Sequence, residues 1–296
     1  MDLKGIYVPL ITPFAADGTV CLDSLRKLAG ELLEAGAAGL VALGTTGEPA
    51  ALTADERQAV IDVAADACAA FGAQLIVGAS GGDTRATAEA LVALGARAPR
   101  AAAALVTAPA FVRPGEAGTV AHFRALAAAS PLPLIVYHIP YRTGQQLSTA
   151  ALRELAAIDG VVGVKYATGG LDQTAAELLA DTPEGFAVLT GEDVYLAPML
   201  AVGAAGGILA SAHLATARFV ELDAAWRAGE VGRARDLGHR LTALALAAFT
   251  APNPSVTKGV LHAQGRIPTP DVRLPLLPAG RAEVDAALAL VNGLDH

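Results

Sequence analysis

Residues 161–170 read VVGVKYATGG and combine a buried-strand pattern with a lysine. A short apolar run between glycines is typical of a strand inside a parallel sheet, and this one carries Lys165 at its carboxyl end. Burial disfavours the charged form of an amine, so the pattern predicts a lowered pKa for Lys165 and a larger neutral fraction. Lys165 is therefore a candidate nucleophile that forms a Schiff base with a ketone, unless it opens a loop and points into water.

Seven further apolar runs alternate with alanine-rich stretches of helical character. The eight predicted strands span 6–12, 39–44, 74–79, 103–108, 133–138, 161–166, 186–191 and 206–211. Strands that alternate with helices pair in parallel, and eight such units close an α/β, (β/α)8 TIM barrel whose active site lies at the carboxyl ends of the strands. An open doubly wound sheet is the competing architecture, but GASGGD at 78–83 lacks the glycine spacing of its fingerprint.

The ends of the helical stretches give further expectations. The first helix is expected to begin at an Asp23 cap and to stop at Gly36.

From about residue 216 the chain shows helical stretches only. We therefore expect a barrel over 1–221 that carries the active site, and a C-terminal helical domain over 222–296 packed on it. In the second of the late stretches, helical spacing predicts a buried face formed by Leu237, Leu241, Leu244 and Phe249.

The composition excludes several classes of protein. A hydrophobic share of 53% with 17% charged residues is typical of a folded core, and a net charge of −8 disfavours nucleic acid as a partner. No apolar run has the length of a membrane span. Cys21 and Cys68 have no metal-ligand spacing, and the six histidines form no cluster with one another. We expect a cytoplasmic protein with no metal and no membrane partner.

Polar residues follow several of the predicted strands. Thr45 and Thr46 lie in GTTGE at 44–48, where hydroxyls and consecutive backbone amides would form a concavity for a carboxylate, although the segment also fits an ordinary turn. Tyr137 ends the fifth strand and could donate and accept a proton, or lie at the rim with its hydroxyl in water. Arg142 offers a bidentate fork for a second carboxylate, or is simply solvated.

The combination of these motifs is more specific than any one of them. GTTGE at 44–48, YxxPxRTG at 137–144, GVKxATG at 163–169 and TGED at 190–193 follow one another in this order. The chain thereby resembles, over essentially its whole length, the pyruvate-dependent class I aldolase superfamily of dihydrodipicolinate synthase and N-acetylneuraminate lyase. Thr45, where the lyases tend to have serine, and Arg142 are more similar to the synthase branch.

The resemblance implies a role for each residue at the centre of the reaction. Lys165 would condense with the ketone of pyruvate, and Tyr137 with Thr46 would carry protons during imine formation and carbon–carbon bond formation. Thr45 and Thr46 would bind the carboxylate of pyruvate, while Arg142 would hold the carboxylate of aspartate semialdehyde.

The resemblance also implies how the site is completed. Gly191 and Ile208 match positions whose backbone carbonyls face the bound substrate. No metal or organic cofactor is needed, because the protonated imine is itself the electron sink. A homo-oligomer is implied as well, either a dimer or a tetramer built from dimers.

Two departures from the synthase pattern stand out. Phe111 occupies the position of a tyrosine that crosses the dimer interface and completes the proton relay, so the relay here has a possible defect. The positions of the lysine-feedback site correspond to Ala54 or Arg57, Arg85 and Ala110, and we therefore expect no inhibition by lysine. The alternatives to the synthase are an aldolase or dehydratase of a 2-keto-3-deoxy sugar acid and a catalytically lapsed keto-acid-binding protein.

Overall fold

The computed structural model describes residues 2–294, and its strands follow one another in a closed parallel barrel from β1 to β8. The strands are β1 (Gly5–Pro9), β2 (Gly39–Ala42), β3 (Gln74–Gly78), β4 (Ala103–Thr107), β5 (Leu134–His138), β6 (Val161–Tyr166), β7 (Ala187–Thr190) and β8 (Gly206–Ile208). Every predicted run overlaps one strand, and none of these strands extends past the end of its run. The predicted (β/α)8 barrel is confirmed.

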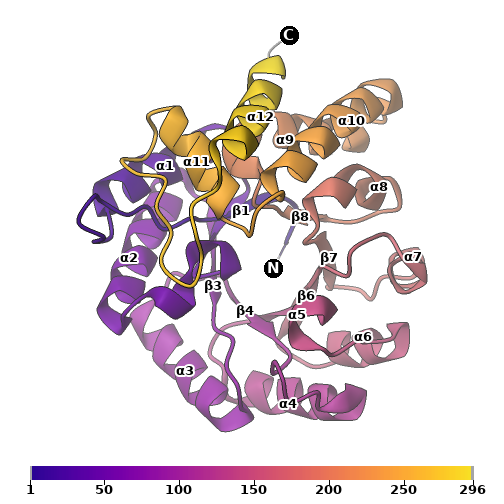
Figure 1. Cartoon of the computed structure of the whole chain (residues 1–296). Coiled ribbons are helices and arrows are strands. Elements are labelled where there is room, and N and C mark those ends of the chain that lie inside the picture. The colour runs from indigo at the N-terminus through magenta and orange to yellow at the C-terminus, as the bar shows by residue number, and fades with distance from the viewer. Residues whose placement is uncertain (1, 295–296) are drawn as a thin grey trace. The chain divides into compact units, whose positions relative to one another are not determined.

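Helices separate the strands and continue beyond β8 (Figure 1). They are α1 (Leu22–Glu34), α2 (Ala54–Phe71), α3 (Thr84–Arg97), α4 (Gly115–Ala129), α5 (Pro140–Thr143), α6 (Thr149–Ala156), α7 (Gln173–Ala180), α8 (Leu196–Ala201), α9 (Ala212–Arg227), α10 (Val231–Ala248), α11 (Ser255–Ala263) and α12 (Arg281–Gly293). Short 3₁₀ turns are η1 (Thr45–Gly47), η2 (Pro49–Ala51) and η3 (Asp193–Tyr195).

The N-cap of the first helix lies two residues before the predicted cap. Cys21 is the N-cap of α1, and its side chain makes no capping hydrogen bond. Asp23 lies in the first turn instead, where its carboxylate meets the positive end of the helix dipole and pairs with Arg26 at 2.8 Å. The prediction of an Asp23 cap was therefore wrong. The predicted stop is confirmed, because Gly36 has a φ of +95° that favours glycine.

One compact unit contains the described residues up to Gly5 together with Ile76–Ile208. In this unit β4, β5 and β6 pair in parallel, with Tyr137 opposite Thr107 on one side and opposite Lys165 on the other. Gly163 allows β7 to come close to β6, since a Cβ at this position would lie 2.6 Å from the carbonyl oxygen of Ala187. The register of β5 and β6 thus places Tyr137 and Lys165 side by side.

The second compact unit contains Ile6–Leu75 and the described residues from Leu209 onward. Its C-terminal helices pack on one another, α10 on α9 and α12, and α11 on α12 (Figure 1). Helices α11 and α12 approach closely because residue 259 is glycine, where a Cβ would lie 2.4 Å from the side chain of Val284.

The expected apolar face of α10 is largely observed. Leu237, Leu241 and Leu244 are at most 7% exposed, as predicted. Phe249 is 46% exposed because α10 ends at Ala248, so the helical spacing no longer applies to it and this part of the prediction was wrong.

The proposed boundary between 221 and 222 falls inside α9, and the division into a barrel and a helical domain stays a prediction. Over residues 2–294, the helices are all too short or too polar to traverse a lipid bilayer.

Candidate active site

Lys165 lies inside β6 and does not open a loop. Its side chain is 7% exposed, and this burial lowers its pKa to about 8 although the nearby Asp193, Tyr141 and Glu192 favour the charged form. An amine with a pKa near 8 is neutral in roughly one molecule in five at pH 7.4, against roughly one in 10³ for an unperturbed lysine. The expected increase in nucleophilic amine is therefore present, and the solvent-exposed alternative is excluded.

Two neighbours fix the course of the Lys165 side chain. Its Nζ lies 4.2 Å from the ring centroid of Tyr137, which is 8% exposed. On the other side, a Cβ at Gly191 would lie 2.8 Å from Cε of Lys165 and 2.9 Å from its Cγ. Only glycine leaves room for the lysine chain against the backbone after β7. The structure thus brings together Lys165, Tyr137 and Gly191, three of the predicted site residues.

The chain that follows Lys165 is braced by one carboxylate. Asp172 accepts a hydrogen bond from the hydroxyl of Tyr166 at 2.7 Å and another from the hydroxyl of Thr168 at 3.1 Å. The same side chain caps α7 by accepting from the backbone N–H of Ala175 at 2.8 Å. These contacts hold the end of β6, so they preserve the position from which Lys165 projects.

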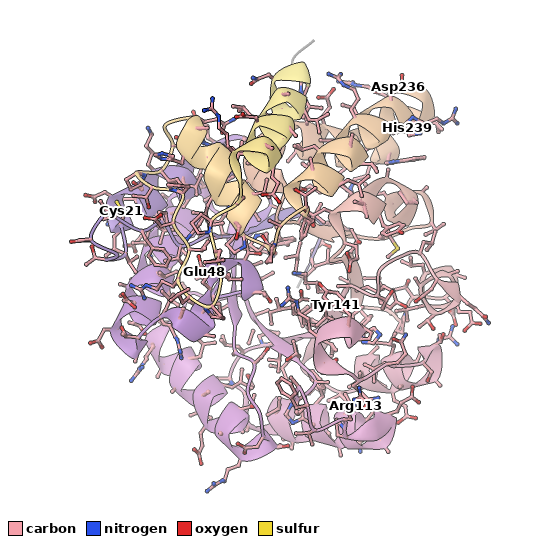
Figure 2. The ribbon with its side chains drawn as sticks, viewed as in Figure 1. Cys21, Glu48, Arg113, Tyr141, Asp236 and His239 are labelled. Carbon is pink, nitrogen blue, oxygen red and sulfur yellow. The ribbon has the colours of Figure 1, made fainter. Side chains whose placement is uncertain are left out.

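Charged and phenolic groups from α5 and from the segment after β7 act on the Lys165 amine. Tyr141 and Arg142 lie on α5, with the Arg142 guanidinium 5.5 Å from the Tyr141 ring centroid (Figure 2 marks Tyr141). Asp193, in the TGED segment, is 6% exposed. The burial of Glu192, together with the negative charge of Asp193, raises the pKa of Glu192. Sequence reasoning identified Arg142 but missed Tyr141 and Asp193 as groups whose charges act on Lys165.

The structure also gives the positions of the other predicted site residues in this unit. Ile208 is the last residue of β8 and is 1% exposed. Arg142 is exposed to solvent. Phe111 is 97% exposed in the loop between β4 and α4, and its φ of +67° is uncommon for a residue other than glycine. It carries no hydroxyl that could take part in proton transfer.

Thr45 and Thr46 belong to the second unit, where β2 runs into η1. Leu43 and Glu48 on either side of this turn have φ of +54° and +53°, conformations that cost energy for residues with a Cβ. Thr46 is 4% exposed, whereas the side chain of Thr45 faces solvent. A turn with two such residues needs support from its surroundings.

The turn is supported first by its nearest neighbours. Thr12 donates its hydroxyl to the carbonyl oxygen of Gly47 at 2.8 Å, and a Cβ at Gly47 would lie 3.0 Å from the carbonyl oxygen of Leu10. The carbonyl oxygen of Leu10 therefore lies so close to Gly47 that a side chain at this position would crowd it.

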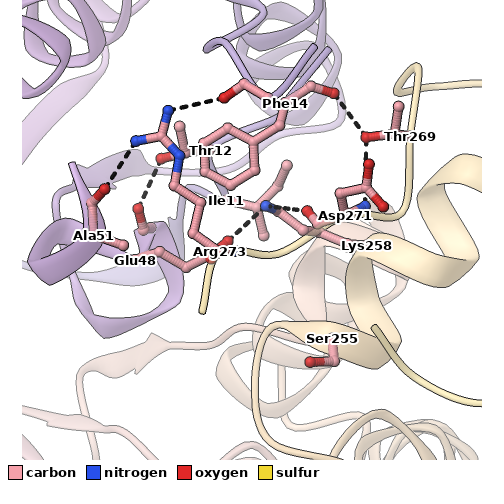
Figure 3. Close-up of polar contacts among 12 residues, drawn as sticks. Ile11, Thr12, Phe14, Glu48, Ala51, Ser255, Lys258, Thr269, Asp271 and Arg273 are labelled. Atoms are coloured by element: carbon pink, nitrogen blue, oxygen red, sulfur yellow. Dashed lines mark hydrogen bonds and ion pairs between the residues drawn. The ribbon is translucent and has the colours of Figure 1, made fainter. Parts of the chain in front are cut away.

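A buried ion pair supplies the second support (Figure 3). Lys258 donates to the carboxylate of Glu48 at 2.5 Å, and the side chains are 0% and 2% exposed respectively. Lys258 also donates to the carbonyl oxygen of Asp271 at 2.8 Å, and its Nζ lies 3.9 Å from the ring centroid of Phe14. The second carboxylate oxygen of Glu48 accepts from the backbone N–H of Arg273 at 2.8 Å. Each charge thus has a protein partner.

Arg273 extends this network to the start of α2. Its guanidinium pairs with both carboxylate oxygens of Glu56, at 2.6 and 2.7 Å, and donates to the carbonyl oxygen of Ala51 at 2.8 Å. The hydrogen bond from Arg273 holds the pKa of Glu56 down at about 2. Burial lowers the pKa of Lys258 to about 8, while Glu48 opposes that shift.

Thr46 itself has a partner from far along the chain. The side-chain amide of Asn253 donates to the hydroxyl of Thr46 at 2.9 Å across 207 positions of sequence. Nothing local in the sequence points to this contact or to the Glu48–Lys258 pair. The TGED motif, by contrast, could have identified Asp193 from the sequence.

Within residues 2–294, histidine, cysteine and carboxylate side chains form no group of three that could hold a metal ion.

Comparison with known proteins gives a consistent result. The model of the dihydrodipicolinate synthetase family matches residues 2–292. The 4-hydroxy-tetrahydrodipicolinate synthase of Moorella thermoacetica is 37% identical over 292 residues, which cover 99% of this chain and 98% of that protein.

Solved structures agree in fold. The dihydrodipicolinate synthase of Thermotoga maritima matches with a TM-score of 0.93 and 28% identity, covering 99% of both chains. The chloride-inhibited dihydrodipicolinate synthase of Acinetobacter baumannii complexed with pyruvate matches with a TM-score of 0.91 and 32% identity, covering 98% of this chain and 99% of that one.

Proposed function

Because the chain belongs to the dihydrodipicolinate synthetase family, we propose that it condenses pyruvate with aspartate semialdehyde through an imine on Lys165. Enzymes of this family are lyases that form a covalent Schiff base between a lysine and pyruvate and use no external cofactor. The observation that carries the proposal for this chain is the burial of Lys165 against Tyr137, with its pKa lowered to about 8.

The chemistry follows from the neutral amine. The Lys165 nitrogen adds to the ketone carbon of pyruvate, and the resulting carbinolamine loses water to give a protonated imine. The positive nitrogen withdraws electrons, so a proton leaves the methyl carbon and an enamine forms. That carbon then attacks the aldehyde of the second substrate. Tyr137, beside the amine, would accept and return protons, and the resemblance assigns Thr46 to the same relay.

The substrate carboxylates are assigned by resemblance. Thr45 and Thr46 would bind the carboxylate of pyruvate, and Arg142 would meet that of aspartate semialdehyde. The solvent exposure of Arg142 supports this role, because an exposed guanidinium can capture an incoming substrate. The backbone carbonyls of Gly191 and Ile208 would face the bound molecule.

Three finer properties belong to the same proposal. The protein would be a homo-oligomer, a dimer or a tetramer, which sedimentation would establish. It would not be inhibited by lysine, because Arg85 and Ala110 lack the feedback-site side chains; saturable inhibition in a lysine titration would contradict this. A cytoplasmic location is supported by Cys21 and Cys68, which form no disulfide, as is usual in a reducing compartment.

The test of the central proposal is chemical trapping. The protein is incubated with pyruvate, reduced with borohydride and mapped by peptide mass spectrometry. We expect the adduct only on the peptide of Lys165, and none in Lys165→Met. Lys258 is an internal control, since its pKa is lowered to about 8 as well but its amine is engaged by Glu48 and Asp271. An adduct elsewhere, or no adduct on the folded protein, contradicts the proposal.

Kinetics then identify the second substrate. We expect turnover of pyruvate with aspartate semialdehyde. A large kcat/KM for 2-keto-3-deoxy sugar acids alone would instead identify an aldolase or dehydratase. Binding of the keto acid without turnover of any of these substrates would identify a lapsed enzyme.

A further inference from the structure

Glu192 follows directly after Gly191, the residue whose backbone packs against the Lys165 side chain. The backbone is anchored at this point, because the N–H of Gly191 donates to the carbonyl oxygen of Tyr166 at 2.7 Å. The Glu192 side chain is partly buried and accepts a hydrogen bond from the backbone N–H of Gly169. A carboxylate is therefore held beyond the carboxyl ends of β6 and β7, near the candidate nucleophile.

The charge of this carboxylate acts together with a cation on the neighbouring helix α5. Burial raises the pKa of Glu192, and the positive charges of Lys165 and Arg142 oppose this rise. Charges affect one another in this way when only a few ångströms separate them. Among residues 2–294, however, Glu192 and Arg142 form no ion pair with each other. The two opposite charges, both in the unit that contains Ile76–Ile208, thus lie near each other without direct contact.

These groups run from a buried amine to an exposed guanidinium. Lys165 is 7% exposed, Glu192 is partly buried, and Arg142 is exposed to solvent. An aldehyde that reacts at Lys165 must reach the buried end, so the rest of its molecule lies toward Glu192 and Arg142. The arrangement suits a substrate with its carbonyl at one end and charges of both signs at the other.

An α-amino acid carries those two charges on one carbon atom. Aspartate semialdehyde has an ammonium and a carboxylate there at neutral pH, and its aldehyde is at the far end of the side chain. An ammonium has three hydrogen-bond donors and no acceptor, and its strongest partner is a carboxylate. Glu192 can supply that partner while Arg142 takes the carboxylate. A 2-keto-3-deoxy sugar acid has hydroxyl groups in place of the ammonium.

We propose that Glu192 is a specificity-determining residue that binds the α-ammonium group of the second substrate while Arg142 binds its carboxylate. The inference rests on the proposed function, from which it takes aspartate semialdehyde and the role of Arg142. It adds a physical reason for the choice of substrate. An aldehyde acid without the amino group leaves the partly buried carboxylate of Glu192 without a cation to bind.

Two aldehydes and two substitutions test this. Succinate semialdehyde has the carboxylate and the aldehyde of aspartate semialdehyde but lacks the amino group. Glu192→Gln removes the negative charge and keeps an oxygen that can accept from the N–H of Gly169. This variant should raise the KM for aspartate semialdehyde at least about tenfold, within what a hydrogen bond to a charged group contributes. The inhibition constant of succinate semialdehyde, measured in competition with aspartate semialdehyde, should stay unchanged. Arg142→Gln should weaken the binding of both aldehydes.

Glu184→Gln is the matched control. Glu184 is exposed and precedes β7, whereas Glu192 follows it, so this substitution removes the same charge at the opposite end of the same strand. It should leave both constants unchanged. Trapping of the pyruvate imine with borohydride, at a pH above the pKa of Lys165, should give the same yield in every variant. Equal yields show that the compared proteins are folded and loaded with pyruvate.

The outcomes separate this inference from the proposed function. A wild-type protein that forms no Lys165 adduct, or that turns over sugar acids alone, would overturn the proposed function and this inference together. If wild type condenses pyruvate with aspartate semialdehyde, but Glu192→Gln weakens both aldehydes equally or neither of them, the inference alone is overturned. If Glu192→Gln does not fold, the wild-type comparison decides. Wild type that binds succinate semialdehyde as tightly as aspartate semialdehyde would contradict an ammonium site at Glu192.

Discussion

The side-chain nitrogen of Lys165 lies 4.2 Å from the centroid of the Tyr137 ring, and the two residues occupy opposite register positions of β5 and β6. The electron-rich face of the ring attracts an ammonium group, while burial disfavours its charge. Burial lowers the pKa of Lys165 to about 8, although the nearby Asp193 and Glu192 favour the charged form. The amine thus lies against the ring, and a larger fraction of it is neutral near physiological pH than in an unperturbed lysine.

The pH dependence of imine formation should follow the amine. Because the pKa of Lys165 is lowered to about 8, the rate of adduct formation with pyruvate should rise with pH and level off above about 8. Rapid-mixing measurements between pH 6 and 10 would determine the midpoint. A midpoint near the ordinary lysine value would contradict the burial argument.

Removal of the amine should stabilise the fold. The folded-state pKa of Lys165 lies below its ordinary value of 10.5, so between about 8 and 10.5 the folded protein binds fewer protons than the unfolded chain. Wild-type stability therefore increases as pH rises through this window. Lys165→Met should gain up to about 3 kcal/mol of unfolding free energy below pH 8 and lose this advantage above pH 10.5. Urea denaturation at pH 6.5 and pH 10.5 would measure the unfolding free energies of wild type and Lys165→Met. A variant that is less stable than wild type at pH 6.5 would contradict the prediction.

The hydroxyl and the ring of Tyr137 should have separable effects. Tyr137→Phe keeps the ring under Lys165 but removes the proton carrier, so kcat should fall by roughly 10² to 10⁴. The midpoint of the pH profile for imine formation should stay near that of wild type, because the burial of Lys165 is preserved. Steady-state kinetics and the trapping assay measure the two effects, and an unchanged kcat would exclude Tyr137 from the relay.

Gly191 should tolerate no side chain. Gly191→Ala places a Cβ within 2.8 Å of Cε of Lys165 and should displace the amine, lowering the rate of adduct formation at least tenfold. Gly170→Ala is the matched control, since a Cβ there would meet only Tyr195 at an ordinary 3.7 Å. Trapping with pyruvate compares the two, and equal rates would show that the lysine chain can move aside.

The buried ion pair should be costly to break from one side. Lys258→Met and Glu48→Gln each leave a buried group without its charged partner, and each should lower the unfolding free energy by about 3–5 kcal/mol. The double variant removes both charges and should recover a large part of that loss. Chemical denaturation of the four proteins measures this coupling, and additive losses would show that the two side chains act independently.

The strands and the burial of Lys165 could be predicted from sequence because their signals are local. An apolar run identifies a buried strand by itself, and Lys165 stands out because it interrupts such a run. The start of α1 was misplaced because Asp23 resembles a cap, although the helix begins after Cys21, whose side chain makes no capping bond. Local preference could not distinguish a cap from a first-turn carboxylate.

The support of the threonine turn could not be predicted, since its contacts depend on the complete fold. Asn253 and Lys258 occur in a stretch that reads only as helix, and their partners are about two hundred positions earlier. Tyr141 was likewise passed over, because the short helix α5 that carries it has too few residues to show periodicity.

The distance along the chain between Glu48 and Lys258, 210 positions, also orders events during synthesis. A ribosome makes the Gly44–Glu48 turn early, long before the lysine that neutralises its carboxylate exists. The last contacts of this turn can form only when the chain has emerged as far as Lys258. A chain cut short before Asn253 lacks both the counter-charge and the donor to Thr46, so the threonine turn can reach its final form only after the 207 positions that separate Thr46 from Asn253 have been made.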